Sequence, residues 1–230
     1  DGTGPTMTIT SGTVNSGDAS NDSSIALTFT SSEATTNFAE ADITVSGGSL
    51  SNFSATSSTV YTATFTPSDD GATTIDVGAG TFTDAMGNAN TAAAQFTWTY
   101  DGTGPTVVIT SSTVSSGDTS NDISIALTFT SSEATTNFVE GDITVSGGSV
   151  SNFSATSSTV YTATFAPTSD GATTIDVGAG TFTDAYGNNN SAASQFNWTY
   201  DSTGPTLASV TAITTPDNDS NPSFVSVSYT

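Results

Sequence analysis

The chain repeats itself at an interval of one hundred residues. The motif Asp-Gly-Thr-Gly-Pro-Thr occupies residues 1–6 and 101–106, and Asp-Ser-Thr-Gly-Pro-Thr occupies residues 201–206. Aligned without a gap, residues 1–100 and 101–200 differ at fewer than one position in five. In a chain of 230 residues, this period predicts two domains of about 100 residues joined at a recurring acidic, Gly- and Pro-containing motif.

Residues 201–230 align with residues 101–130 but diverge strongly from them. We expect them to supply only the first two strands of a third, divergent repeat. Two strands are marginal by themselves, so either the ordered chain continues beyond them or they complete a sandwich in a neighbouring chain. Because the chain begins without Met and in mid-pattern, we expect it to be a segment of a longer protein.

Short runs in which apolar and polar residues alternate predict β-strands in each unit. In one such run, Ile25, Leu27 and Phe29 point to the same face. Clusters of Gly, Asp, Asn and Ser separate the runs, and no helical periodicity appears. The strands expected in the first unit lie at 7–10, 24–30, 42–46, 50–54, 60–66, 73–77 and 95–100. Seven short strands in about 100 residues predict an all-β fold, in which tandem seven-stranded immunoglobulin-like sandwiches form an extended rod.

The charge of the chain is entirely acidic. It contains 22 Asp and Glu residues and no Lys, Arg or His. Phosphate binding requires basic side chains, so nucleic acid and anionic membrane surfaces are excluded as partners. No stretch fits a signal peptide or a transmembrane helix, so we expect no direct membrane insertion in this segment.

The same composition argues against catalysis. Without His, Cys, Lys or Arg, only carboxylates, hydroxyls and the backbone remain as catalytic groups. The adjacent Asp69 and Asp70 lie on one turn, and Ser169 replaces Asp69 in the second unit. Such a pair does not suit the two-carboxylate mechanism of a glycosidase, so we expect no enzymatic activity.

The acidic residues suit calcium, which takes six to eight oxygen ligands. In an immunoglobulin-like sandwich the first strand begins at the end where the second–third and sixth–seventh loops emerge. Asp101 should therefore lie near Glu133, near Asp184 with Asn188, and near Asp142 or Glu140. The opposite end of the preceding unit faces Asp101 and carries Asp18, Asn21, Asp22, Asp69 and Asp70. The candidate metal ligands are Asp1, Glu33, Asp42, Asp70, Asp84, Asn88, Asp101, Glu133, Asp142, Asp170, Asp184, Asn188 and Asp201.

Several of these residues have a simpler explanation. Asp and Asn cap backbone N–H groups in β-turns, which we prefer for Asp18, Asn21 and Asp22. Repeated Thr-x-Thr patterns could form an ice-binding face, but Thr commonly occupies the solvent side of a strand. We also expect Trp98 and Tyr100 to pack in the core and junction rather than to bind sugar.

A set of residues resembles a known family. It comprises Ser32-Glu33-Ala34, Phe38, Asp42-Ile43-Thr44-Val45, Tyr61, Phe82-Thr83-Asp84-Ala85 with Gly87-Asn88, and the Tyr-Asp-x-Thr-Gly-Pro motif. Together these resemble the bacterial immunoglobulin-like repeats of large secreted adhesins and surface-fibre proteins. The resemblance covers both full units and, more weakly, residues 201–230.

The resemblance implies a structural extender at the extracellular cell surface, stiffened by calcium between domains. The implied partners are neighbouring repeats of the same chain. Two other functions stay open. One is a self-assembling filament in which strands complement other copies, and the other is an immunoglobulin-like module that binds carbohydrate or protein.

Overall fold

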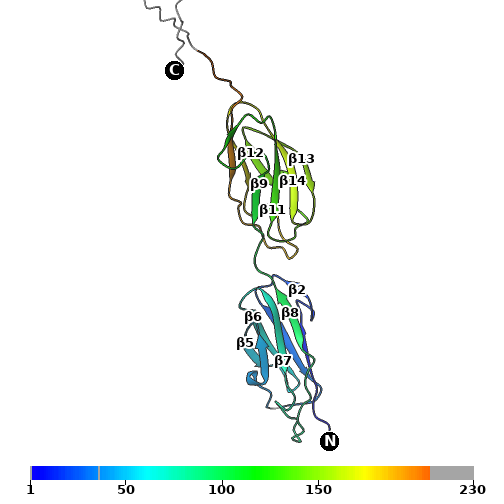
Figure 1. Cartoon of the computed structure of the whole chain (residues 1–230). Coiled ribbons are helices and arrows are strands. Elements are labelled where there is room, and N and C mark those ends of the chain that lie inside the picture. The colour runs from blue at the N-terminus through cyan, green and yellow to red at the C-terminus, as the bar shows by residue number, and fades with distance from the viewer. Residues whose placement is uncertain (1, 36, 208–230) are drawn as a thin grey trace, which may run out of the picture.

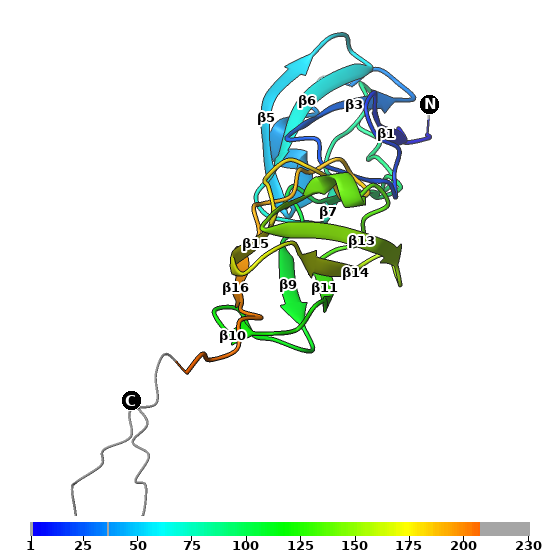
Figure 2. The ribbon, with the colours of Figure 1, turned by 90° about the horizontal axis from the view of Figure 1, so that it is seen from above.

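The computed structural model describes residues 2–35 and 37–207 and shows two β-sandwich units joined end to end (Figure 1). The units correspond to the two copies of the repeat, and in the described residues no sheet contains strands of both. Seen from above, the two units partly overlap (Figure 2). Within these residues no helix has the length and apolar character needed to cross a membrane.

Two four-stranded sheets form the first unit. One has the order β1-β3-β6-β5 and the other the order β2-β8-β7-β4. The elements are β1 Met7–Ser11, β2 Ala19–Ser20, β3 Ile25–Ser31, the 3₁₀ helix η1 Glu40–Asp42, β4 Ile43–Ser46, β5 Gly48–Ala55, β6 Val60–Pro67, β7 Gly71–Val77 and β8 Phe96–Tyr100.

The second unit repeats this arrangement, with sheets β9-β11-β14-β13 and β10-β16-β15-β12. Its elements are β9 Val107–Ser111, β10 Thr119–Ser120, β11 Ile125–Ser131, η2 Glu140–Asp142, β12 Ile143–Ser146, β13 Gly148–Ala155, β14 Val160–Pro167, β15 Gly171–Val177 and β16 Phe196–Tyr200.

Within residues 2–35 and 37–207 each unit has eight strands, one more than the seven that the sequence predicted. The additional strand is β2, whose Ala19 pairs in parallel with Thr99 of β8. The chain leaves the first sheet after β1 and reaches the second sheet through Gly17, whose φ of +95° suits glycine. The Gly17 N–H donates to the carbonyl of Thr97 at 2.8 Å. A two-residue parallel strand has no alternation of its own, which is why the pattern did not reveal it.

The edge strand β5 is longer than the predicted strand at 50–54. A register shift between Ser51 and Ser54 marks a bulge against β6, and Asn52 sits there with a φ of +54°. Asn tolerates the left-handed region better than most residues. Bulges of this kind make an exposed edge a poor template for further strands.

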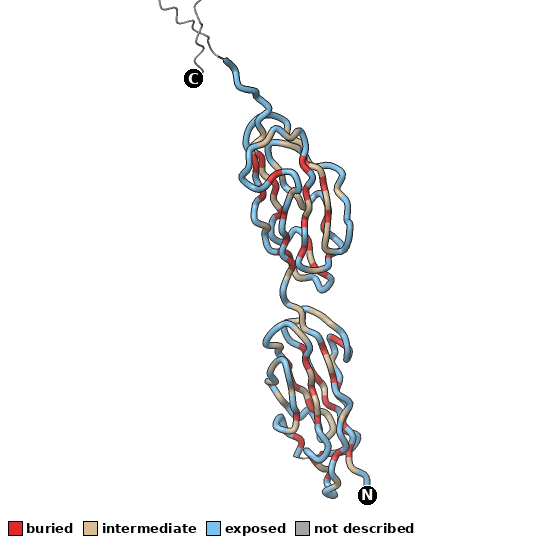
Figure 3. Tube along the Cα trace, viewed as in Figure 1, coloured by how far each residue is buried: buried red, intermediate tan, exposed pale blue. Residues whose placement is uncertain are grey.

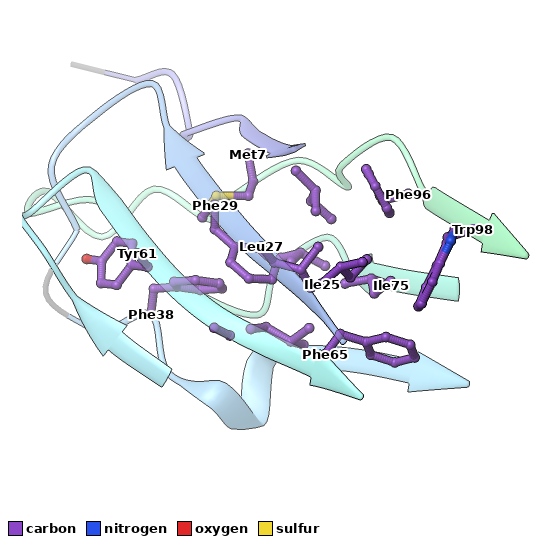
Figure 4. Close-up of a cluster of buried hydrophobic side chains, with 14 of the residues drawn as sticks. Met7, Ile25, Leu27, Phe29, Phe38, Tyr61, Phe65, Ile75, Phe96 and Trp98 are labelled. Carbon is purple, nitrogen blue, oxygen red and sulfur yellow. The ribbon is translucent and has the colours of Figure 1, made fainter. Parts of the chain in front are cut away.

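The core of each unit lies between its two sheets, where the inward positions of the strands meet (Figure 3). Figure 4 shows this core in the first unit. Ile25, Phe29 and Phe65 are fully buried, as the alternating pattern predicted. The ring of Phe38, from the loop after β3, packs edge-on against Tyr61 with centroids 4.9 Å apart. The Tyr61 hydroxyl donates to the carbonyl of Thr35 at 2.9 Å, which satisfies a buried polar group.

Candidate functional site at the junction of the units

The linker between the units, residues 101–106, is held by backbone hydrogen bonds at both ends. The Asp101 N–H donates to the Ser20 carbonyl of the first unit at 3.1 Å. At the other end, the Ser191 N–H of the second unit donates to the Pro105 carbonyl at 3.0 Å. The linker therefore belongs to both units rather than being a free tether.

Gly104 is required by close packing. A Cβ atom at this position would lie 1.9 Å from the backbone oxygen of Asn189 in the loop between β15 and β16. Gly4 meets the backbone oxygen of Ala89 in the same way, at 1.8 Å. The glycine before the proline is therefore explained in the first two copies of the motif by its contact with this loop, since any larger residue would push the loop away.

Asp70 clamps the linker from the side of the first unit. Its carboxylate accepts a hydrogen bond from the Gly102 N–H at 2.7 Å and another from the Thr103 hydroxyl. These hydrogen bonds lower the pKa of Asp70 below its ordinary value, and the one from the Thr103 hydroxyl contributes more than the one from the Gly102 N–H.

The same clamp recurs one hundred residues later. The Asp170 carboxylate accepts hydrogen bonds from the Ser202 N–H at 2.9 Å, the Ser202 hydroxyl at 2.7 Å and the Thr203 hydroxyl. These bonds, the Ser202 hydroxyl first, lower the pKa of Asp170. Asp70 and Asp170 were predicted as metal ligands, and this stays a prediction; in the structure each carboxylate accepts hydrogen bonds from the linker that follows its unit.

Three carboxylates meet at the same junction. Asp101 comes from the linker, Glu133 from the loop after β11, and Asp184 from the loop between β15 and β16. Each contributes one oxygen to a group whose members all lie within 4.8 Å of one another. The loop topology of the sandwich predicted that these three residues would lie close together, although Asp184 follows Asp101 by 83 positions in the sequence.

Asp184 is the most buried member of the group, with 8% of its surface exposed. Its carboxylate accepts hydrogen bonds from the Tyr186 N–H at 2.8 Å, the Asn188 N–H at 2.9 Å and the Asn188 side-chain amide at 2.8 Å. Burial is the largest influence and raises the pKa of Asp184, but these hydrogen bonds together outweigh it and the pKa lies below its ordinary value. Asp184 is thus fixed in position as an anion.

Asn188 connects the group to the first unit. Its side-chain amide also donates to the Asp101 carbonyl at 2.9 Å, and its side-chain oxygen accepts from the Asn21 amide of the first unit at 3.2 Å. Asn21 was expected at the end of the first unit that faces Asp101, with a role in its own turn preferred, and its hydrogen bond to Asn188 of the second unit was not predicted.

Glu133 lies where the negative charges converge. The pKa of its carboxyl is raised, first by burial and then by the charges of Asp101, Asp184 and Asp70. The group adjoins a cleft of about 460 Å³ between the units, also lined by Tyr100 of the first unit and Tyr186 of the second. A cation in this cleft would relieve the repulsion that Glu133 experiences.

The group fits calcium in its chemistry and its spacing. Calcium binds oxygen at about 2.3–2.6 Å, so two ligands of one ion lie at most about 5 Å apart. Oxygens within 4.8 Å of one another satisfy this limit. Asp101, Glu133 and Asp184 would hold the ion, and water would complete the six to eight positions.

Asp142 and Asp42 do not join such a group. Each ends a 3₁₀ helix, and its carboxylate turns back to accept the backbone N–H of Val139 or Ala39, in both cases at 2.8 Å. Because the helix directs these side chains toward their own turn, they act as local caps.

The first unit carries the same loops at its far end. Asp84 is buried and accepts the Met86 and Asn88 N–H groups at 2.9 and 2.8 Å. The pKa of Asp84 is lowered, and the hydrogen bond from the Asn88 side chain is the largest cause. Glu33 lies in the loop after β3, as Glu133 does after β11. Asp1, the predicted third ligand, lies outside the described residues.

The far end of the second unit repeats the start of a junction. The Asp201 N–H donates to the Ser120 carbonyl at 3.0 Å, as Asp101 does to Ser20. Asp201 therefore occupies the position of Asp101, and the residues that would face it, together with the expected strands of a third repeat at 208–230, lie outside the described residues.

The chain belongs to the bacterial Ig-like domain family, whose sequence profile matches residues 1–100 and again 101–200. Comparison with curated proteins gave no significant match. The family assignment agrees with the resemblance found in the sequence and with the sandwich fold of both units.

Three solved structures illustrate the similarity. InvD of Yersinia pseudotuberculosis is 19% identical over 92% of this chain and 63% of its own, with a TM-score of 0.39. Invasin, described as a bacterial integrin-binding protein, is 16% identical over 85% and 40%, with a TM-score of 0.45. The adhesin InvE of Y. pseudotuberculosis is 16% identical over 86% and 58%, with a TM-score of 0.32. The chain thus spans less than two thirds of each, and at these scores the structures add nothing to the family assignment.

Proposed function

We propose that the chain is an extender segment of a bacterial extracellular adhesin or surface fibre, and that calcium stiffens its junctions. The observation that carries the proposal is the linker, which both units grip and which Asp70 clamps. A tether between independently acting domains would need no such contacts. The role is mechanical and involves no catalytic step.

Calcium would act at Asp101, Glu133 and Asp184. Without a cation, three carboxylates within 4.8 Å repel one another and favour movement of the linker away from the second unit. An ion shared by the linker and two loops of the second unit would instead tie them together. Extracellular calcium modules bind at about 10⁻⁴ to 10⁻³ M, a range that suits a protein outside the cell.

The clamp and the ion can be tested separately by small-angle X-ray scattering. Asp70→Ala removes the acceptor for Gly102 and Thr103 at the junction between the units, and we expect a broader distribution of inter-unit angles and a shorter mean particle. Asp170→Ala is the matched control, because it removes the same side chain one hundred residues later and leaves this junction intact. A profile for Asp70→Ala identical to that of the control would contradict the clamp.

The calcium component has its own readout. Adding a chelator to the unsubstituted chain should shorten the particle and lower its melting temperature, while calcium should restore both. Scattering profiles and melting curves that do not differ between chelator and 10 mM calcium, roughly ten or more times the expected dissociation constant, would remove calcium from the proposal. The clamp, measured by the Asp70→Ala variant, would remain.

A further inference from the structure

The outer faces of the sheets β1-β3-β6-β5 and β9-β11-β14-β13 carry no charge. Of the 22 acidic residues in the chain, none lies in these eight strands. The opposite sheets differ, because β7 carries Asp76 and β15 carries Asp176 on their outward positions. Acidic residues elsewhere in the described chain lie in loops, 3₁₀ helices and the linker.

The uncharged faces are built from short hydroxyl side chains in register. In the first unit, Thr10 pairs with Thr28, Thr28 with Thr62, and Thr62 with Ser54, which forms one row across all four strands. The second unit repeats the row from Thr110 to Ser154. None of the four residues of the first row is buried. Short β-branched side chains lose little conformational entropy when a partner covers them.

The second unit makes its face more apolar. Val108 takes the outward place that Thr8 has in the first unit, and 58% of its surface is exposed. Such a side chain gains from being covered. The change from Thr to Val makes the face more apolar without adding charge, as a contact surface requires.

We propose that these uncharged faces, which we call the Thr faces, are the surfaces through which copies of this chain associate side by side. A second copy carries the same formal charge of −22, so contact through any acidic surface brings like charges together. The Thr faces are the positions where two copies can meet with the least of that repulsion. Two twisted sheets of the same hand also pack against each other readily, at about 30°.

The size of the faces sets the strength of the contact. Four strands about 4.8 Å apart and about seven residues long cover roughly 400 Å² with their side chains. A standard protein interface buries about 800 Å² on each partner, so one unit on one unit gives a weak dimer. Association should grow with the number of units that engage at once.

A rigid crystalline partner suits the faces less well. The hydroxyl rows are in register, but adjacent strands of a sheet rotate by about 20–25° relative to one another. That rotation prevents four strands from matching a flat lattice such as ice. The twist matches that of a second copy, which carries it too.

The test is sedimentation velocity of the full chain in chelator, at chain concentrations up to about 1 mM and at several sodium chloride concentrations. We expect the weight-average mass to rise with concentration, and to rise more steeply in 0.5 M than in 0.01 M salt because salt screens the acidic loops. The double variant Thr28→Glu with Thr128→Glu places a charge at the centre of each Thr face and should weaken association at least about tenfold.

The matched control is Thr44→Glu with Thr144→Glu, which adds the same charge to the outer faces of the opposite sheets. It should associate like the unsubstituted chain. If the first double variant does not fold, judged by circular dichroism and melting temperature, Thr10→Glu with Thr110→Glu on the exposed edge strands replaces it. A chain that stays monomeric under all conditions, or a control that weakens association equally, would overturn the proposal. So would a monomeric chain whose Thr faces are retained on an insoluble polysaccharide or on ice.

Discussion

Glu133→Gln separates repulsion among the three carboxylates from calcium binding. It should reduce the repulsion, which stabilises the second unit in chelator, and weaken calcium binding, which lowers the stabilisation by calcium. The carboxylate of Glu133 lies within 4.8 Å of those of Asp101 and Asp184. In a water-like dielectric each pair repels by about 0.9 kcal/mol, and screening at physiological salt leaves roughly half. Neutralising Glu133 in chelator should therefore stabilise the second unit by about 1 kcal/mol.

A gain of this size corresponds to a rise in melting temperature of about 4–8 °C for a domain of about 100 residues. In 10 mM calcium the unsubstituted chain gains about 1.4–2.7 kcal/mol if its dissociation constant lies between 10⁻³ and 10⁻⁴ M. Losing one of three carboxylates should weaken calcium binding by about tenfold, or about 1.4 kcal/mol. Glu133→Gln should therefore melt at a higher temperature than the unsubstituted chain in chelator, and at about the same temperature in calcium.

Differential scanning calorimetry in chelator and in calcium measures both quantities on the intact chain. Glu140→Gln is the control, because Glu140 lies in the same unit and carries the same charge but stands outside the group of three. It should change neither quantity appreciably. The reasoning fails if Glu133→Gln lowers the melting temperature in chelator, or if calcium stabilises the variant as much as the unsubstituted chain.

Three further predictions concern the fold and the linker. Tyr61→Phe leaves the Thr35 carbonyl without its buried partner and should destabilise the first unit by about 1–3 kcal/mol, seen as a lower first transition in calorimetry. Gly104→Ala drives a Cβ into the backbone oxygen of Asn189 and should detach the linker, seen as faster amide exchange at residues 102–104 and 106. The pKa of Asp70 is lowered on folding, so its contribution is complete above its unfolded value and is lost as pH falls below about 4. Scattering should therefore show the junction loosening in that acidic range, and an unchanged profile would contradict it.

The strands could be predicted because a half-buried strand alternates strictly between apolar and polar residues. Ile25, Leu27 and Phe29 face the core, and the residues between them face outward. This alternation can be recognised without knowing the partner strand. The proximity of Asp101 to Glu133 followed from the same prediction, because the order of strands in a sandwich determines which loops share an end.

The features that were missed depend on contacts that no local pattern encodes. β2 is two residues long and is held by β8, about 80 residues away. The clamp at Asp70 is formed with the Gly102 N–H, a backbone donor that every non-proline residue has. One signal was present, since Asp70 is kept as Asp170 whereas its neighbour Asp69 becomes Ser169. Asp142 was placed at the start of a strand, and the 3₁₀ helix that turns its carboxylate away was not foreseen.

The distribution of charge joins the two proposals into one argument about assembly. Acidic residues gather at the ends of each unit, where the next unit follows, and are absent from the strands of the Thr faces. Under the two proposals, calcium stiffens the end-to-end contact that the linker and Asp70 already make, whereas side-by-side contact depends on screening of the remaining repulsion. Sodium chloride should strengthen lateral association yet compete with calcium at the junction, while calcium at fixed ionic strength should stiffen the junction and leave lateral association unchanged. If calcium drove lateral association through the Thr faces, where no carboxylate lies, this division of roles would be wrong.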